Sequence, residues 1–117
     1  MRVDAIFLGQ WKTSAPLSLL TVLAMACGAV RNPALESARD AYQKARQDAV
    51  IVRHAGAALD RAALALEEAD RRWTKDKDVT EVEHLAYIAE KRVQIARVIA
   101  QRRLAADEIQ QVRSPRP

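Results

Sequence analysis

Residues 55–73 read AGAALDRAALALEEADRRW, and this stretch decides the fold class. Its apolar seam positions recur after four and then three residues throughout: Ala55, Leu59, Ala62, Leu66, Ala69 and Trp73. Such spacing places all of them on one face of an α-helix. On the opposite, charged face, Glu68 and Arg72 lie one helical turn apart, where an ion pair supports the helix. We therefore expect a helix over about residues 56–73 that buries one face.

A second apolar seam follows residues 74–79, which carry much charge and no periodicity. Its members are Val82, Leu85, Ala86, Ala89, Val93, Ala96 and Ala100, with Ile88, Ile95, Ile99 and Ile109 beside them. Thr80 and Glu83 form a capping box, T-x-x-E, which predicts a helix over about residues 80–112. Because the turn between the two helices is short, they form an antiparallel hairpin. The apolar stripe is wider than one helix covers, so another helix or another protein is expected to cover the rest.

The chain ahead of this hairpin predicts one more helix, over about residues 33–47. Asn32 is a good N-cap residue, and Pro33 suits the first helical turn. Over residues 48–56 the periodicity is interrupted, and the glycine there costs about 1 kcal/mol in a helix interior. These features indicate a bend or short break; the alternative is one continuous helix over 33–73 with a local stammer. The expected fold is an all-α, coiled-coil-like three-helix module.

The beginning of the chain has the order of a bacterial export signal. Arg2 and Lys12 precede the uncharged run APLSLLTVLAMA, residues 15–26, which ends in small residues. That run is shorter than the about 20 apolar residues that a membrane-spanning helix needs. We expect residues 1–26 to be a signal peptide; the alternative is a buried core helix of a cytosolic protein.

Two kinds of cleavage fit this signal. Ala24 and Ala26 satisfy the small-x-small rule of ordinary signal peptidase, which would release a chain beginning at Cys27. The same residues also resemble a bacterial lipobox, although Ala24 stands where leucine is preferred and Met25 is bulkier than usual. That resemblance implies a diacylglyceryl group on Cys27, because only a thiolate is nucleophilic enough at neutral pH. Gly28 follows instead of Asp, which in Gram-negative lipoproteins implies sorting to the outer membrane.

Composition narrows the function classes. With 117 residues the chain has room for one domain, and little for an enzyme pocket with its scaffold. A net charge of +4 with both signs interspersed is not typical of a nucleic-acid-binding protein. The single cysteine excludes an intramolecular disulfide and a cysteine-rich metal site. With no catalytic Ser-His-Asp arrangement and no glycine-rich phosphate loop, we expect no enzyme activity, cofactor or small-molecule substrate.

Three further features are candidates for binding. His84 has Glu81 and Glu83 nearby, but one histidine is weak evidence for a metal, and we expect it to pack or hydrogen-bond against a neighbouring helix. Trp73 is expected to close the end of the hairpin. Basic residues exceed acidic ones from residue 91 onward, which suggests contact with an anionic surface; the alternative is a solvated face with favourable helix-end charges. The proposed contact residues are Arg102, Arg103, Arg113 and Arg116.

The direction of this basic segment depends on the break over residues 48–56. If the helix is continuous there, the basic segment returns to the lipidated end; if the chain reverses, it points away. The expected organisation is a signal peptide over 1–26, a tether over 27–32, a helical domain over 33–113 and a tail over 114–117.

Residues 60–73, DRAALALEEADRRW, and 81–100, EVEHLAYIAEKRVQIARVIA, resemble a family of alanine-rich bacterial lipoproteins known only as a domain of unknown function. The resemblance covers about residues 34–107. Such domains occur alone or ahead of an OmpA-like peptidoglycan-binding domain; these 117 residues hold no such domain, and the family has no catalytic residues to transfer.

The resemblance and the export signal together imply an envelope lipoprotein in the outer membrane, facing the periplasm, with a structural or adaptor role. The lipoprotein is expected to contact the membrane through the lipid on Cys27. An envelope protein or a second copy of the chain is a candidate for a further partner. The alternative is a secreted, unlipidated helical binding protein cleaved after Ala26.

Overall fold

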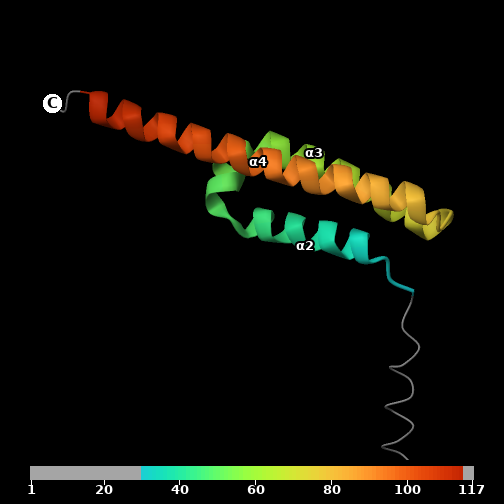
Figure 1. Ribbon diagram of the computed structural model, residues 1–117. Coiled ribbons are helices and arrows are strands. Elements are labelled where there is room, and N and C mark those ends of the chain that lie inside the picture. Colours follow the sequence, from blue (N-terminus) through green and yellow to red (C-terminus); the bar gives the residue numbers. More distant parts are fainter. Residues whose placement is uncertain (1–29, 115–117) are drawn as a thin grey trace, which may run out of the picture. The chain divides into compact units, whose positions relative to one another are not determined.

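A computed structural model describes residues 30–114 of the chain. The chain divides into two units, residues 1–31 and a helical unit that begins at Asn32. Within the described part, the helices are α2 (Pro33–Gln47), α3 (Ala49–Lys75) and α4 (Val79–Arg113) (Figure 1). The predicted all-α three-helix module is therefore confirmed. None of these helices is both long and apolar enough to cross a membrane.

Helix α2 has the predicted bounds, and its start is capped as the sequence indicates. The Asn32 side chain accepts a hydrogen bond from the Leu35 backbone N–H at 3.1 Å. Leu35, Ala38 and Ala45 are buried along its inner face. By spacing, the seam of Ala38, Tyr42 and Ala45 would continue with Ala49 and Val52, but these two are exposed because the chain has already turned before them.

The turn is made at Asp48, which ends α2 and begins α3. Its carboxylate accepts hydrogen bonds from the backbone N–H of Val50 at 2.9 Å and of Ile51 at 3.4 Å. Helix α3 therefore begins earlier than the residue 56 predicted for it, and the alternative of one continuous helix is wrong. Helical geometry is interrupted again inside α3, at Ala55, with φ −138° and ψ 30°. The single predicted disturbance over 48–56 is thus a turn followed by a kink.

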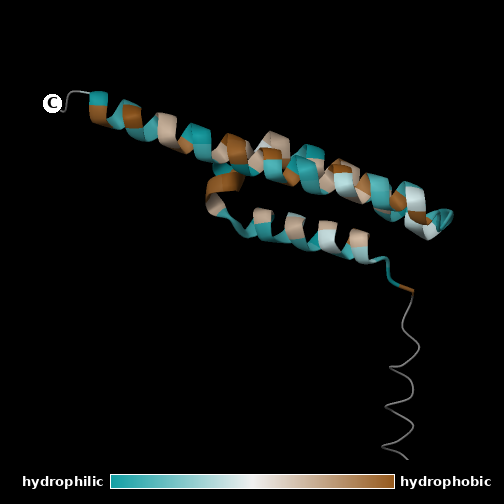
Figure 2. Ribbon diagram, in the orientation of Figure 1, coloured by the Kyte–Doolittle hydropathy of each residue, from teal (hydrophilic) through white to brown (hydrophobic). Residues whose placement is uncertain are grey.

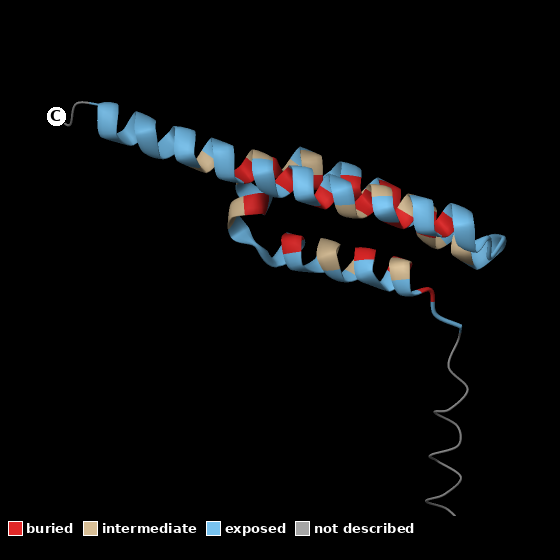
Figure 3. Ribbon diagram, viewed as in Figure 1, coloured by how far each residue is buried: buried red, intermediate tan, exposed pale blue. Residues whose placement is uncertain are grey.

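The core consists of two clusters in which alanine predominates. The cluster near the α3–α4 turn contains Leu35, Ala38, Ala65, Leu66, Ala69, Val82, Ala86 and Ala89. The other contains Ala45, Ile51, Ala55, Leu59, Ala62, Val93, Ala96 and Ala100. Each cluster draws on all three helices, so α2 packs antiparallel to α3 and lies against α4 as well (Figures 1 and 3). The seams predicted for α3 and α4 are confirmed.

The α3–α4 turn passes through Lys77, which adopts a left-handed φ of 51°. Half-buried Trp73 packs on the core cluster beside it, as expected, and the Lys77 Nζ lies 5.1 Å from the centre of its ring. The predicted Thr80 capping box is wrong. Asp78 is the N-cap of α4, and its side chain accepts from the backbone N–H of Glu81 at 3.2 Å.

Helix α4 extends past the other two helices. Its last buried residue is Ala100, and beyond it only Leu104 is half-buried. Residues 105–113 are all exposed, and we call them the projecting end of α4 (Figure 3). At 1.5 Å per residue this end is about 14 Å long.

Candidate functional site

The outward side of α4 combines exposed apolar side chains with nearby charges. Hydrophobic residues recur along this helix as far as its C-terminal end (Figure 2). Ile95 is 55% exposed, Ile109 52% and Val112 87%. Isolated exposed apolar residues are ordinary on protein surfaces, whereas a row of them along one helix is a candidate contact surface.

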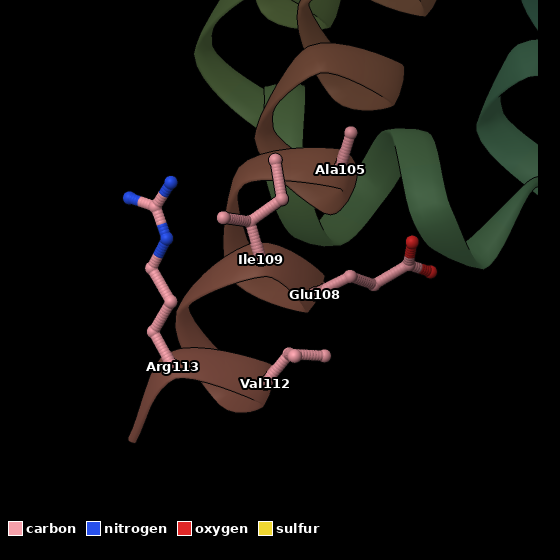
Figure 4. Close-up of a pocket in the computed structure, with 5 residues that line it drawn as sticks. All are labelled: Ala105, Glu108, Ile109, Val112 and Arg113. Atoms are coloured by element: carbon pink, nitrogen blue, oxygen red, sulfur yellow. The ribbon is translucent and has the colours of Figure 1, made fainter.

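The projecting end carries a shallow hollow along this row. It is lined by Ala105, Glu108, Ile109, Val112 and Arg113 (Figure 4). Glu108 extends to one side of the helix and Arg113 to the other. Apolar contact flanked by opposite charges suits the binding of another protein segment, because the charges select orientation while the apolar atoms supply burial.

Arg103 lies at the α3–α4 interface. Its Nη1 donates a hydrogen bond to the main-chain oxygen of His54 at 2.5 Å. Beside it, His54 Nδ1 lies 3.5 Å from Asp107 Oδ2, and the His54 side chain is only 13% exposed. Arg92 makes a similar contact, donating to the main-chain oxygen of Arg61 at 3.1 Å. Arg103 is therefore occupied within the fold.

The other predicted anionic-contact residues are placed differently. Arg102 is exposed on α4, and Arg113 is exposed at the projecting end. Arg116 lies outside the described residues, as do Cys27 and the cleavage and sorting residues Ala24, Ala26 and Gly28. The structure thus leaves Arg102 and Arg113 available for an external anion.

Contacts of α2 show which way the helical unit runs. The Ser37 hydroxyl donates to Glu90 Oε1 at 2.5 Å, and Arg39 donates to the carboxylate of Asp70. That hydrogen bond to Asp70 raises the pKa of Arg39. Since Asp70 and Glu90 lie toward the α3–α4 turn, α2 begins at the turn end of the unit. The chain has reversed, and the basic segment leads away from the start of α2.

His84 does not occupy the packed position expected of it. It is exposed near the start of α4, while His54 lies beside Asp107 toward the other end of the unit. Over residues 30–114, no group of three or more His, Cys, Asp or Glu side chains gathers as a metal site.

Sequence reasoning missed Val98 and Val112 as members of the exposed row. Val98 is 46% exposed, and it lies between Ile95 and Ile109 on the outward side. The signal was present as a second spacing of three and four along α4, offset from the buried seam.

Comparison with known proteins identifies one match. A family model described as a domain of unknown function (DUF4398) matches residues 33–112. No curated protein and no solved structure gives a significant match.

Proposed function

The chain belongs to the DUF4398 family, and from that premise we propose that it is a cell-envelope lipoprotein, anchored through acylated Cys27, with a non-catalytic adaptor role. The family match spans nearly all of the helical unit and starts at Pro33. Only the short tether, residues 27–32, therefore separates the proposed lipid from the domain.

The observation that carries this proposal is the position of the only cysteine. Cys27 comes directly after an uncharged apolar run that ends in Ala-Met-Ala. Several acyl chains at this residue would hold the protein stably on a membrane, whereas one chain binds only marginally. Gly28 after the cysteine supports sorting to the outer membrane, with the helical unit facing the periplasm.

The adaptor role is supported by the open side of α4. Its exposed apolar row and flanking charges offer binding area. A lipid on Cys27 would be joined to the start of α2, whereas the projecting end lies at the opposite end of the helical unit. We therefore propose that the projecting end meets partners away from the anchoring membrane.

Contact with an anionic surface is the second part of this proposal. Arg102, Arg113 and Arg116 would supply the cations, without Arg103, which bonds to His54. Replacing these three by Gln is expected to weaken binding of the unlipidated chain to anionic vesicles, by about 1 kcal/mol per cation near the surface. Unchanged binding would remove this part of the proposal.

Labelling with a fatty acid tests the anchor. Cells producing the full chain are expected to place label on the protein and to hold it in the outer-membrane fraction. Cys27→Ser is expected to abolish the label and to release the protein from the membrane. Gly28→Asp is expected to keep the label but to place the protein in the inner membrane. Unlabelled wild-type protein in the periplasmic fraction would contradict the proposal.

The second candidate is a secreted, unlipidated helical binding protein, cleaved after Ala26. Ala24 and Met25 favour it, because both depart from the usual lipobox, while Ala24 and Ala26 satisfy the ordinary peptidase. In that case the unlabelled, soluble outcome of the same experiment is the expected one.

A further inference from the structure

A second hollow lies between α3 and α4, on the face of this hairpin that α2 leaves open. Its volume is about 300 Å³, and it is lined by Ala58, Arg61, Arg92, Ile95 and Ile99. Helix α2 bonds instead to Asp70 of α3 and Glu90 of α4. At 3.6 residues per turn, Asp70 and Arg61 point to opposite sides of α3, and Glu90 and Arg92 to opposite sides of α4. No described helix therefore covers this hollow.

One of its two arginines is already held in place. The Arg92 Nη1 donates a hydrogen bond to the main-chain oxygen of Arg61 at 3.1 Å, which fixes its guanidinium across the two helices. A guanidinium has five N–H donors, so this single bond leaves others for an external acceptor. Because part of the side chain is fixed in advance, binding an anion there costs less conformational entropy than ordering a free arginine.

The chain supplies no carboxylate to these two arginines. Within residues 30–114, the arginines Arg39, Arg71 and Arg72 form ion pairs with carboxylates three or four residues away, whereas Arg61 and Arg92 form none. The sequence gives the reason, because every position three or four residues from either arginine is apolar: Ala57, Ala58, Leu64, Ala65, Ile88, Ala89, Ile95 and Ala96. Two positive charges therefore meet at one hollow without a counter-charge from their own helices.

The rest of the hollow is apolar. Ala58 and Ile99 are half-buried, and Ile95 is 55% exposed. An apolar wall with a few fixed polar groups is the usual composition of a small-molecule site, and about 300 Å³ is the lower end of the size range of such sites. At about 30 Å³ for a water-sized group, the hollow takes about ten such groups.

We propose that this hollow binds a single-chain anionic amphiphile, with its carboxylate or phosphate head group on Arg61 and Arg92 and its hydrocarbon chain along Ile95 and Ile99. Guanidinium groups bind both kinds of head group through paired N–H donors. The hydrocarbon chain would cover the apolar wall, which the chain's own helices leave open.

Charge and size select this class of ligand. A free anion would leave Ile95 and Ile99 uncovered, and a neutral hydrocarbon would remove the two guanidinium groups from water without a partner. A whole helix is about 10 Å across with its side chains and is too wide for a hollow of this volume. An acyl chain with an anionic head group satisfies both parts of the site at once.

Residue-resolved NMR of the full chain with Cys27→Ser tests the site, and the substitution makes the result independent of the proposed anchor. Dodecanoate, kept below its micelle-forming concentration, is expected to shift the signals of the residues that line the hollow. Its Kd is expected to be about 1 mM or lower, the ordinary affinity for a ligand of this size. Dodecyl phosphate is the second probe, and the tighter of the two identifies the preferred head group.

Two further ligands need no change in the protein. Dodecyltrimethylammonium has the same chain with the opposite charge, and acetate has the head group without the chain. Neither is expected to give saturable shifts at the hollow over the same concentrations. Equal binding of the cationic amphiphile would show that the arginines select nothing, and equal binding of acetate would show that the apolar wall contributes nothing. Either result overturns the proposal, as does the absence of binding by both anionic probes.

A pair of variants tests the arginines themselves. Arg61→Gln with Arg92→Gln is expected to raise the Kd by about tenfold or more, because hydrogen bonds to charged groups are lost. Arg97→Gln is the matched control, since Arg97 is exposed on α4 and does not line the hollow, and it is expected to leave the Kd unchanged. Unchanged helicity by circular dichroism establishes that each variant is folded. Equal Kd values for the double variant and the control would overturn the proposal.

Discussion

Arg103 Nη1 donates to the main-chain oxygen of His54, 2.5 Å away, across the interface between α4 and α3. His54 directly precedes Ala55, where helical geometry is interrupted. A kink disturbs the hydrogen-bond ladder of a helix, and its carbonyl groups then need other donors. Arg103 supplies such a donor at the last part of α4 that is still packed.

Replacing this donor is expected to destabilise the fold. Arg103→Gln loses a charged hydrogen bond at a partly open site, which costs about 1 kcal/mol in the free energy of unfolding. Urea unfolding followed by circular dichroism measures it. Arg97→Gln is the control, an exposed arginine on the same helix, and is expected to cost close to nothing. Equal stability of the two variants would show that the His54 contact contributes nothing.

The alanine-rich core is expected to be intolerant of larger residues. Ala96 is fully buried between helices whose close approach depends on its small side chain. Ala96→Leu is expected to destabilise the protein by about 1–3 kcal/mol through overpacking. Ala57→Leu adds the same atoms at an exposed position on α3 and is expected to be neutral. Thermal unfolding distinguishes them, and a stable Ala96→Leu variant would mean that the helices are not closely packed there.

Lys77 holds a left-handed conformation in the α3–α4 turn, with φ 51°. A residue with a Cβ is strained there, whereas glycine is not. Lys77→Gly also loses the contact of Nζ with the Trp73 ring, so Lys77→Ala, which loses that contact but keeps the strain, is the comparison. The free energy of unfolding is expected to be about 1 kcal/mol higher for the glycine variant than for the alanine variant. Equal free energies of unfolding for the two variants would show that the left-handed backbone at Lys77 is not strained.

Glu68 makes stability depend on pH. Hydrogen bonds from Arg71 and Arg72 lower the pKa of Glu68 below its ordinary value of 4.5. A carboxyl group with a lowered folded-state pKa stabilises the fold above its unfolded pKa, and this contribution is lost as pH falls through the folded pKa. Melting temperature is thus expected to fall more steeply below pH 4.5 in the wild type than in Glu68→Gln. Glu67→Gln, at an exposed neighbour, is expected to keep the wild-type slope.

Helix existence and the buried seams were predictable because both follow from local periodicity. The seam from Ala55 to Ala69 is buried as its spacing indicates, and α2 has the bounds that Asn32 and Pro33 signal. The start of α4 was misplaced by one residue, because Asp78 and Glu81 offer a second cap just ahead of Thr80 and Glu83. Spacing alone does not tell which of two overlapping caps is used.

The reversal at Asp48 was less predictable. Val52 and Ala49 fit the α2 seam by spacing, but both are exposed, since α3 starts again with Ile51 inward. Which face a helix restarts on depends on packing against α4, and that is a long-range effect. The internal use of Arg103 was hidden for the same reason, because its acceptor is a backbone oxygen 49 residues away.

The central claim is the anchor at Cys27, and the intact mass of protein extracted from membranes tests it most directly. The account predicts a chain that begins at Cys27 and carries the added mass of acyl chains, with no such addition in Cys27→Ser. An unmodified chain beginning at Cys27, recovered in the soluble fraction of wild-type cells, would contradict it.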